Sequence, residues 1–309
     1  MRVFVTGATG ALGRYLVPGL VAAGHQVTAT TRTAGKVSGL RAAGAEPVIL
    51  DGLDRTAVLA AVRAAGPEVI VHQMTALAGL GGLRHLDRAF AATNQLRTRG
   101  TDNLLAAAVA AGTRRVVAQS YTGWPNEHSG GPVKTEDDPL DPSPVPSSAR
   151  TLAAIRHVEQ NVPRAVPEGV VLRYGSFYGP GTSEEMLGRV RRRRLPLVGG
   201  GTGVWSFTEV TDAAAATVAA VGRGSPGLYN VVDSDPAPVA QWLPYLARVA
   251  GGKPPLSVPA GVGRLLAGDF VTAYLTTARG SANDKARHEL GWEPRYPSWR
   301  EGFRAWAAG

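Results

Sequence analysis

The chain has 309 residues, 44% of them hydrophobic, with 33 Lys and Arg against 24 Asp and Glu. This size suits one large α/β domain and a smaller second lobe. The absence of cysteine excludes disulfides and thiolate chemistry, and the six histidines give no ligand pair at helical spacing. No apolar run reaches membrane length and no secretory leader is recognisable, so we expect a cytoplasmic protein that binds neither a membrane nor a metal.

The net charge of +9 raises the question of a nucleic-acid partner. The densest basic run lies over 189–194. Consecutive arginines on a helix point in all directions, so most of them must be solvated. We therefore expect no nucleic acid, and contact of this run with an acidic substrate stays open.

In chain order, short β-rich runs alternate with Ala- and Leu-rich helical stretches through the first 175 residues. This alternation is typical of a parallel sheet with helices on both faces. We expect strands at Arg2–Thr6, Gln26–Thr31, Glu46–Leu50, Glu68–His72, Arg114–Gln119 and Gly169–Tyr174, and helices at Ala11–Ala23, about Leu86–Ala111 and Ala149–Asn161.

The fold class is thus α/β, a doubly wound parallel sheet of the Rossmann type. We expect a nucleotide-binding domain over 1–175, to which the chain returns at about 206–232, and a smaller substrate-binding lobe over 176–309. The proline-rich stretch Thr122–Ser148 follows the fifth strand. Its many prolines argue against regular structure, and a loop of this length at a strand end is placed to form a wall or lid.

The glycine-rich segment Thr6-Gly7-Ala8-Thr9-Gly10-Ala11-Leu12-Gly13 follows the first strand directly and opens the first helix. Its first glycine permits the tight turn, the second lets the backbone approach a pyrophosphate, and the third allows close helix–strand packing. The helix N-terminus then binds the diphosphate. The segment predicts a dinucleotide site, with contacts from Gly7, Thr9, Gly10, Ala11, Leu12 and Gly13.

The end of the second strand indicates which dinucleotide is bound. It reads Thr30-Thr31-Arg32-Thr33, with Lys36 one turn later and no carboxylate before Glu46. An NAD site usually has an acidic residue here for the ribose 2′-hydroxyl, whereas a guanidinium binds a 2′-phosphate. We therefore predict NADPH, although Arg32 could instead be an ordinary exposed arginine. Asp51, followed by Gly52, is placed to accept from the adenine amino group.

These segments resemble the extended short-chain dehydrogenase/reductases, the NAD-dependent epimerase/dehydratase family. The resemblance covers nearly the whole chain and includes 71–75, 100–105, 172–181, 206–212 and 290–294. It implies further cofactor contacts at the fourth-strand end, in the central helix, on the fifth strand and at the nicotinamide carboxamide: Gln73, Met74, Thr75, Asn94, Gln119, Ser120, Tyr174, Gly175, Ser176 and Phe177.

The family's catalytic Tyr-x-x-x-Lys pair is missing. Four residues before Lys36, Lys134, Lys253 and Lys285 stand Arg32, Gly130, Val249 and Ser281. The family's Tyr-x-x-x-Lys-x-x-x-Glu pattern, aligned on Glu159, puts Thr151 at the tyrosine and Ile155 at the lysine. A threonine hydroxyl is a far poorer acid than a phenol. The family's catalytic Ser or Thr falls among Ser120, Tyr121 and Thr122.

In this departure the chain resembles the atypical ketoreductases of aromatic polyketide (angucyclinone) pathways. A ketone with a neighbouring phenol can supply its own proton, so we expect an NADPH-dependent ketoreductase of an aromatic ketone, in antibiotic biosynthesis. Trp124, Met186 and Leu187 could face such a flat substrate, or could simply pack in the core.

Other interpretations stay open. A replacement acid is possible, with Tyr121 favoured over Tyr174 and Tyr178, which match residues packed beside the cofactor. The chain could also be an NADP-dependent enzyme similar to nucleotide-sugar epimerases or dehydratases, or a non-catalytic NADP(H)-sensing regulator. We expect a monomer or a homodimer. The family often dimerises through helices that correspond to 86–111 and 149–161.

Overall fold

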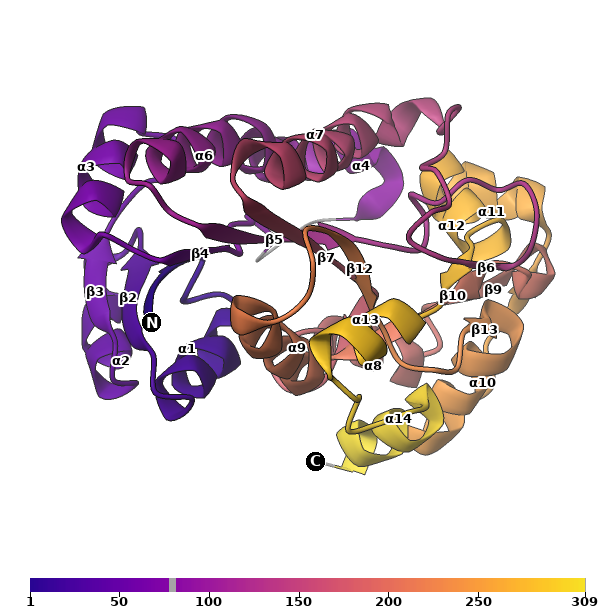
Figure 1. Cartoon of the computed structure of the whole chain (residues 1–309). Helices are drawn as coiled ribbons and strands as arrows, with labels where there is room; N and C mark the ends of the chain where they lie inside the picture. Colours follow the sequence, from indigo (N-terminus) through magenta and orange to yellow (C-terminus); the bar gives the residue numbers. More distant parts are fainter. Residues whose placement is uncertain (78–81, 309) are drawn as a thin grey trace.

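The computed structural model describes residues 1–77 and 82–308. Its centre is a parallel sheet of seven strands in the order β12-β7-β5-β4-β1-β2-β3 (Figure 1). The order runs outward in both directions from β1, so the predicted doubly wound Rossmann-type α/β fold is confirmed. The strands are β1 (Arg2–Thr6), β2 (Gln26–Thr31), β3 (Glu46–Ile49), β4 (Val69–His72), β5 (Arg115–Tyr121), β7 (Glu168–Tyr174) and β12 (Gly227–Val231).

Helices cover both faces of this sheet (Figure 1). Alternate residues of a strand point to opposite faces, so Val3 and Val5 pack in one apolar core while Phe4 packs in the other. One face carries α1 (Gly13–Ala22), α2 (Val37–Ala42), α9 (Val210–Gly222) and α13 (Asp284–Leu290). The opposite face carries α3 (Arg55–Ala65), α4 (Leu86–Ala89), α5 (Ala91–Gln95), α6 (Thr101–Ala110) and α7 (Ala149–Ala165).

Several element bounds differ from the sequence-based expectation. Helix α1 begins two residues later than predicted, which leaves 11–12 in the turn. The expected helix over 86–111 is broken after α4 and contains a π-helical turn, η3 (Leu96–Gly100). The hydroxyl of Thr98 donates to the carbonyl of Asn94 at 2.8 Å, and such side-chain competition for carbonyls disturbs regular helix spacing. Helix α7 continues past Asn161.

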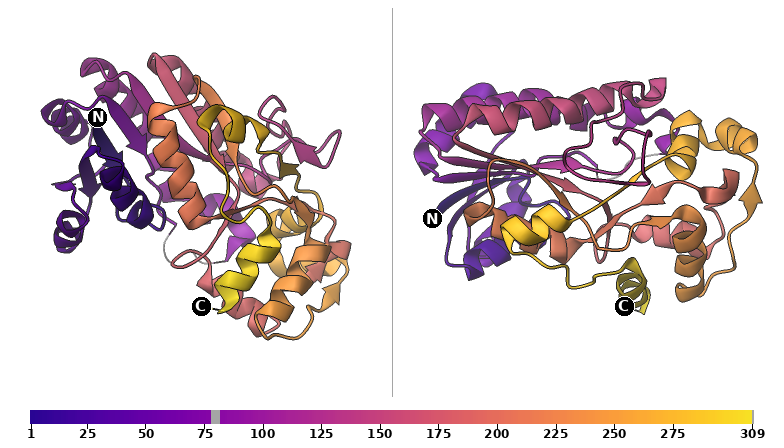
Figure 2. Two further views of the ribbon diagram at one scale, coloured as in Figure 1. Left: turned by 60° about the horizontal axis from the view of Figure 1, so that its bottom comes forward. Right: turned by 45° about the vertical axis from the view of Figure 1, so that its right-hand side comes forward.

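The second lobe is built mainly from residues after β7 and lies at one end of the sheet (Figure 2). Its core is aromatic and includes Trp205, Phe207, Trp242, Trp299 and Phe303. Its strands are β8 (Ser176–Tyr178), β9 (Leu197–Val198), β10 (Val204–Trp205), β11 (Phe207–Glu209), β13 (Ala237–Pro238), β14 (Ser257–Val258) and β15 (Gly280–Ser281). Its helices are α8 (Glu184–Arg191), α10 (Val239–Val249), α11 (Ala260–Ala267), α12 (Asp269–Thr276) and α14 (Trp299–Ala308).

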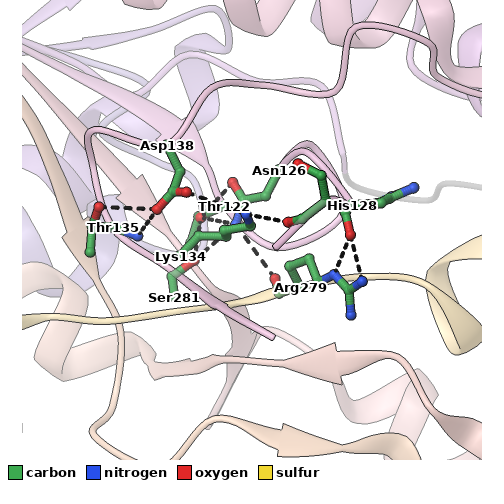
Figure 3. Close-up of polar contacts among 9 residues, drawn as sticks. Thr122, Asn126, His128, Lys134, Thr135, Asp138, Arg279 and Ser281 are labelled. Carbon is green, nitrogen blue, oxygen red and sulfur yellow. Dashed lines mark hydrogen bonds and ion pairs between the residues drawn. The ribbon is translucent and has the colours of Figure 1, made fainter. Parts of the chain in front are cut away.

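The proline-rich stretch 122–148 is not wholly irregular. Strand β6 (Val133–Lys134) pairs in parallel with β15, so the prediction of no regular structure is wrong there. These two residues follow Pro132 and retain the backbone N–H groups that pairing needs. Side chains tie the stretch down as well: Thr122 and Ser281 hydroxyl oxygens lie 2.6 Å apart, and Lys134 pairs with Asp138 (Figure 3).

Further contacts in the same region join the stretch to the second lobe. The Arg279 guanidinium donates to the carbonyl of His128, and the Asn126 amide donates to the Ser281 hydroxyl at 3.1 Å (Figure 3). Hydrogen bonds thus fix the stretch 122–148 against residues 279–281 of the second lobe. Among the described helices, none is both long and apolar enough to cross a membrane.

Candidate active site

The glycine turn after β1 has the geometry of a dinucleotide site. Gly7 has a φ of +74°, and a Cβ there would lie 2.2 Å from the carbonyl oxygen of Gln73. A Cβ at Gly13 would lie 2.3 Å from the carbonyl oxygen of Ala8. Helix α1 begins at Gly13, directly after this turn and without a side-chain N-cap, so the positive end of the helix dipole lies at the turn. The backbone there fits a diphosphate.

A cavity of about 260 Å³ opens beside this turn, and we refer to it as the nucleotide cavity. Nine of its lining residues are sequence-predicted cofactor contacts: Gly7, Thr9, Gly10, Arg32, Lys36, Gly52, Gln73, Met74 and Thr75. The other five were not among the predicted cofactor contacts: Thr30, Thr31, Leu50, Ala76 and Leu96. Three of these five, Thr31, Leu50 and Ala76, directly adjoin predicted positions that follow strands, and this adjacency was the signal available for them.

The part of the cavity beside the end of β2 is basic. Arg32 and Lys36 are exposed, and neither side chain forms a hydrogen bond or ion pair with another described residue. No Asp or Glu is among the lining residues. Asp51 is used locally, since its carboxylate accepts from the backbone N–H of Leu53 at 3.0 Å. Such a site fits a nucleotide that carries a 2′-phosphate.

The remaining expected cofactor contacts lie outside the lining of this cavity. Ala11, Leu12 and Gly13 lie at the start of α1, and Gln119 lies in β5. The Asn94 amide donates to the Thr151 hydroxyl at 3.0 Å. The 176–181 segment approaches the first helix, where the Tyr15 hydroxyl donates to the Pro180 carbonyl at 3.1 Å.

Tyr174, Gly175 and Phe177 have packing roles. The Tyr174 hydroxyl is hydrogen-bonded to Gln73 and to Thr217, at 3.2 and 2.7 Å, and burial raises its pKa to about 12. A Cβ at Gly175 would lie 2.5 Å from the carbonyl oxygen of Ser206. Phe177 packs on Tyr174 with ring centroids 5.2 Å apart.

Ser120 belongs to a buried ion-pair network. Its hydroxyl donates to Glu159 at 2.7 Å, and Arg173 donates to the two oxygens of the same carboxylate at 2.8 and 2.6 Å. All three residues are buried. Burial of a charge is costly unless the charge is paired and hydrogen-bonded, and this carboxylate is both. Ser120 therefore anchors the end of β5 to α7.

Tyr121 has different surroundings. Its hydroxyl lies 2.9 Å from that of Ser176 and 2.6 Å from that of Tyr274, and these last two lie 2.8 Å apart. All three residues are partly exposed. Burial raises the pKa of Tyr121, against these hydrogen bonds and the charge of Arg97, so its phenol stays protonated at neutral pH. Thr122 is instead buried and bound to Ser281.

The two positions of α7 that align with the family's Tyr and Lys are buried. Thr151 is fully buried, and its hydroxyl donates to Asp87 at 2.7 Å and accepts from Asn94. Ile155 is 1% exposed. Neither residue is among those that line the nucleotide cavity.

Aromatic residues pack between the stretch 122–148 and α12. Tyr274 stacks on Trp205 at 3.9 Å between ring centroids, and Trp124 meets Phe270 edge to face at 5.2 Å. A cavity of about 20 Å³ remains among Trp124, Tyr274 and their neighbours, and this is room for about one water. Leu187 is buried in the second-lobe core and Met186 packs against it, so for these two the core alternative holds. Tyr178 is also a core residue.

Comparisons with known proteins agree with this geometry. A model of the NAD dependent epimerase/dehydratase family matches residues 3–231. The chain is 49% identical to a Streptomyces protein named 3-diazoavenalumate denitrifying reductase, over 98% of this chain and 99% of that one. It is 30% identical to a 4-hydroxy-2-methyl-3-oxo-4-farnesyl-3,4-dihydroquinoline-1-oxide ketoreductase of Stigmatella aurantiaca, over 96% and 92%.

Among solved structures, UDP-glucose 4-epimerase from Thermotoga maritima, with UDP-glucose, matches with a TM-score of 0.77 at 21% identity. The match covers 100% of this chain and 98% of that one, and it shows the shared fold. Both sequence relatives are named as reductases, which supports an NAD(P)-dependent oxidoreductase. The family model spans most of the chain, and the chain belongs to the NAD dependent epimerase/dehydratase family.

Proposed function

We propose that the chain is an NADPH-dependent reductase of aromatic ketones that carry a phenol beside the carbonyl. The observation behind the proposal is a nucleotide cavity with Arg32 and Lys36 combined with a helix that holds buried Thr151 and Ile155 where the family has its acid and cation. In this proposal the site keeps the cavity for the hydride donor and lacks the tyrosine that usually donates the proton.

NADPH, when bound, supplies a hydride to the carbonyl carbon. The neighbouring phenol gives its O–H proton to the resulting alkoxide and becomes a phenolate, which regains a proton from water. A positioned general acid is worth about 10²–10⁴-fold in rate, whereas orientation of the reactants supplies roughly 7–11 kcal/mol. The chain's own residues thus act by holding the two partners together: the glycine turn and Arg32 fix the dinucleotide.

A second candidate is reductive loss of a diazo group. It is favoured by the relative that is 49% identical and is named a denitrifying reductase of a diazo compound. For an aryl diazonium, one hydride converts Ar–N₂⁺ to Ar–H and N₂, and no net proton is consumed. This balance also suits a site without the Tyr-Lys pair.

The test is single-turnover oxidation of NADPH with three acceptors: 1-hydroxy-2-acetonaphthone, its 1-methyl ether, and 1,2-naphthoquinone-1-diazide. We expect reduction of the hydroxy ketone and a rate at least 100-fold lower for the methyl ether at saturating concentrations. Equal rates for the two ketones would contradict the substrate-derived proton. Turnover of the diazide alone, with release of N₂, would favour the second candidate, and NADPH binding without any turnover would favour a sensor.

A further inference from the structure

Arg97 is a buried arginine whose donors lack acceptors. It lies in the π-helical turn η3 and is 6% exposed. Its Nε and Nη1 atoms are enclosed and have no hydrogen-bond partner among the described residues. No ion pair joins Arg97 to a described carboxylate, and Glu159, whose charge acts on Arg97, is bound by Arg173 on both oxygens.

The position of this charge relates it to the candidate active site. Leu96, the preceding residue, lines the nucleotide cavity, and η3 packs against α7. Burial lowers the pKa of Arg97 to about 10, against the negative charge of Glu159 and, where the phenol is ionised, that of Tyr121. His72, whose pKa burial lowers to about 4, also feels the charge of Arg97 and is neutral. The guanidinium thus stays charged at neutral pH, and its charge acts on the Tyr121 phenol.

A buried, unpaired charge destabilises the folded protein. A buried cation without a partner costs several kcal/mol, and perturbed groups of this kind gather at functional sites. A guanidinium presents several N–H donors in a fixed plane, which suits an oxyanion better than a neutral acceptor. An anionic oxygen of a bound ligand would therefore satisfy these donors.

We propose that Arg97 is a specificity-determining residue that binds an anionic oxygen, phenolate or carboxylate, of the aromatic substrate. The inference rests on the proposed function, because it takes the region beside Tyr121 as the substrate site. It also deepens that function: a phenol that gives up its proton leaves a phenolate, and a nearby cation with free donors stabilises that charge.

Binding without turnover tests the proposal. Calorimetry on the full chain with saturating NADP⁺ compares three probes: 1-hydroxy-2-acetonaphthone, its methyl ether, and 2-naphthoate. The variants are Arg97→Met, Arg97→Lys and, as control, Arg99→Met, which removes an exposed arginine two residues away on the same turn. The two acidic probes separate the phenolate source from the carboxylate source.

We expect Arg97→Met to weaken at least one of the two acidic probes by 10-fold or more, with the methyl ether changed less than 3-fold. Arg97→Lys keeps the charge and should lose less, while Arg99→Met should match the wild type. In wild type, the absorption spectrum of the bound hydroxy ketone should show phenolate at a lower pH than in solution, and Arg97→Met should abolish this shift.

Two results with bound probes or cofactor would overturn the proposal, and a third comes from thermal unfolding. One is a wild-type protein that binds neither acidic probe better than the methyl ether. The other is an Arg97→Met variant that binds NADPH at least 10-fold more weakly, since Arg97 would then belong to the cofactor. Thermal unfolding separates a structural role: removal of an unpaired buried charge should leave the midpoint equal or higher, and a lower midpoint with unchanged probe binding would make Arg97 a structural residue.

Because these measurements need no turnover, failure of the proposed reduction would leave them interpretable.

Discussion

The phenol oxygens of Tyr121 and Tyr274 lie 2.6 Å apart, although one residue ends strand β5 of the nucleotide-binding sheet and the other belongs to helix α12 of the second lobe. Ser176 completes the set of three hydroxyls. The contact joins the two parts of the chain beside the candidate active site. It also leaves Tyr121 as the one of the three candidate catalytic residues whose hydroxyl is not committed to a buried network.

The first prediction concerns Tyr121 as a proton source. If the substrate supplies its own proton, Tyr121→Phe should lower the single-turnover rate with 1-hydroxy-2-acetonaphthone by less than about 10-fold, below the range of a lost general acid. Tyr274→Phe is the matched control, since it removes the other phenol of the pair. A loss above about 100-fold in Tyr121→Phe alone would assign the proton to Tyr121.

The second prediction concerns cofactor choice. Replacing Arg32 with Ala should raise the dissociation constant of NADPH by about 10–100-fold, because a hydrogen bond to a charged group is worth roughly 1.5–3 kcal/mol. NADH binding should change less than about 2-fold. Calorimetry measures both, with Arg41→Ala, an exposed arginine outside the cavity lining, as control. Wild-type protein that binds the two cofactors equally would contradict the prediction.

The third prediction is that Thr151 is structural. Its hydroxyl is hydrogen-bonded to Asp87 and Asn94. Thr151→Val nearly preserves volume and should reduce the free energy of unfolding by about 1–3 kcal/mol, because it leaves buried polar partners unsatisfied. Single-turnover kcat should stay within about 10-fold. Urea unfolding and stopped-flow NADPH oxidation give the two values, and an undiminished stability with a rate lost more than about 100-fold would reverse the assignment.

The fourth prediction is a pH effect on stability from Asp233. This carboxyl is 3% exposed, and burial raises its pKa well above the usual value. A group whose pKa is higher in the folded state stabilises the fold below its unfolded pKa of about 4, and this stability is lost as the pH rises toward the folded pKa. Asp233→Asn removes that dependence.

The measurement is the thermal midpoint of wild type and Asp233→Asn at pH 5, 6.5 and 8. The variant should gain on the wild type as the pH rises, by roughly 2–4 °C for each kcal/mol of difference. Asp137→Asn, at an exposed position, is the control and should follow the wild type. A difference between Asp233→Asn and wild type that is constant over this range would rule out an ionising role for Asp233.

The central sheet and the glycine turn could be predicted from the sequence alone. These follow from local patterns: β-rich runs fix the strands, and the spacing of Gly7, Gly10 and Gly13 fixes a turn that only a few residues build. The exact bounds of helices and strands depend on more than local sequence patterns. The π-helical turn at η3 and the short pairing of β6 with β15 depend on contacts that no local pattern encodes.

Which candidate side chains lie together depends on the tertiary structure. Tyr121 and Tyr274 are 153 residues apart in the sequence, yet their hydroxyls are hydrogen-bonded. Arg97 lies three residues after Asn94, which the family resemblance gave as a cofactor contact. Whether a hydroxyl is available or committed depends on its partners, as for Ser120 with Glu159 and Thr122 with Ser281. Hydrogen bonding and burial act between residues brought together by folding, so spacing along the chain cannot report them.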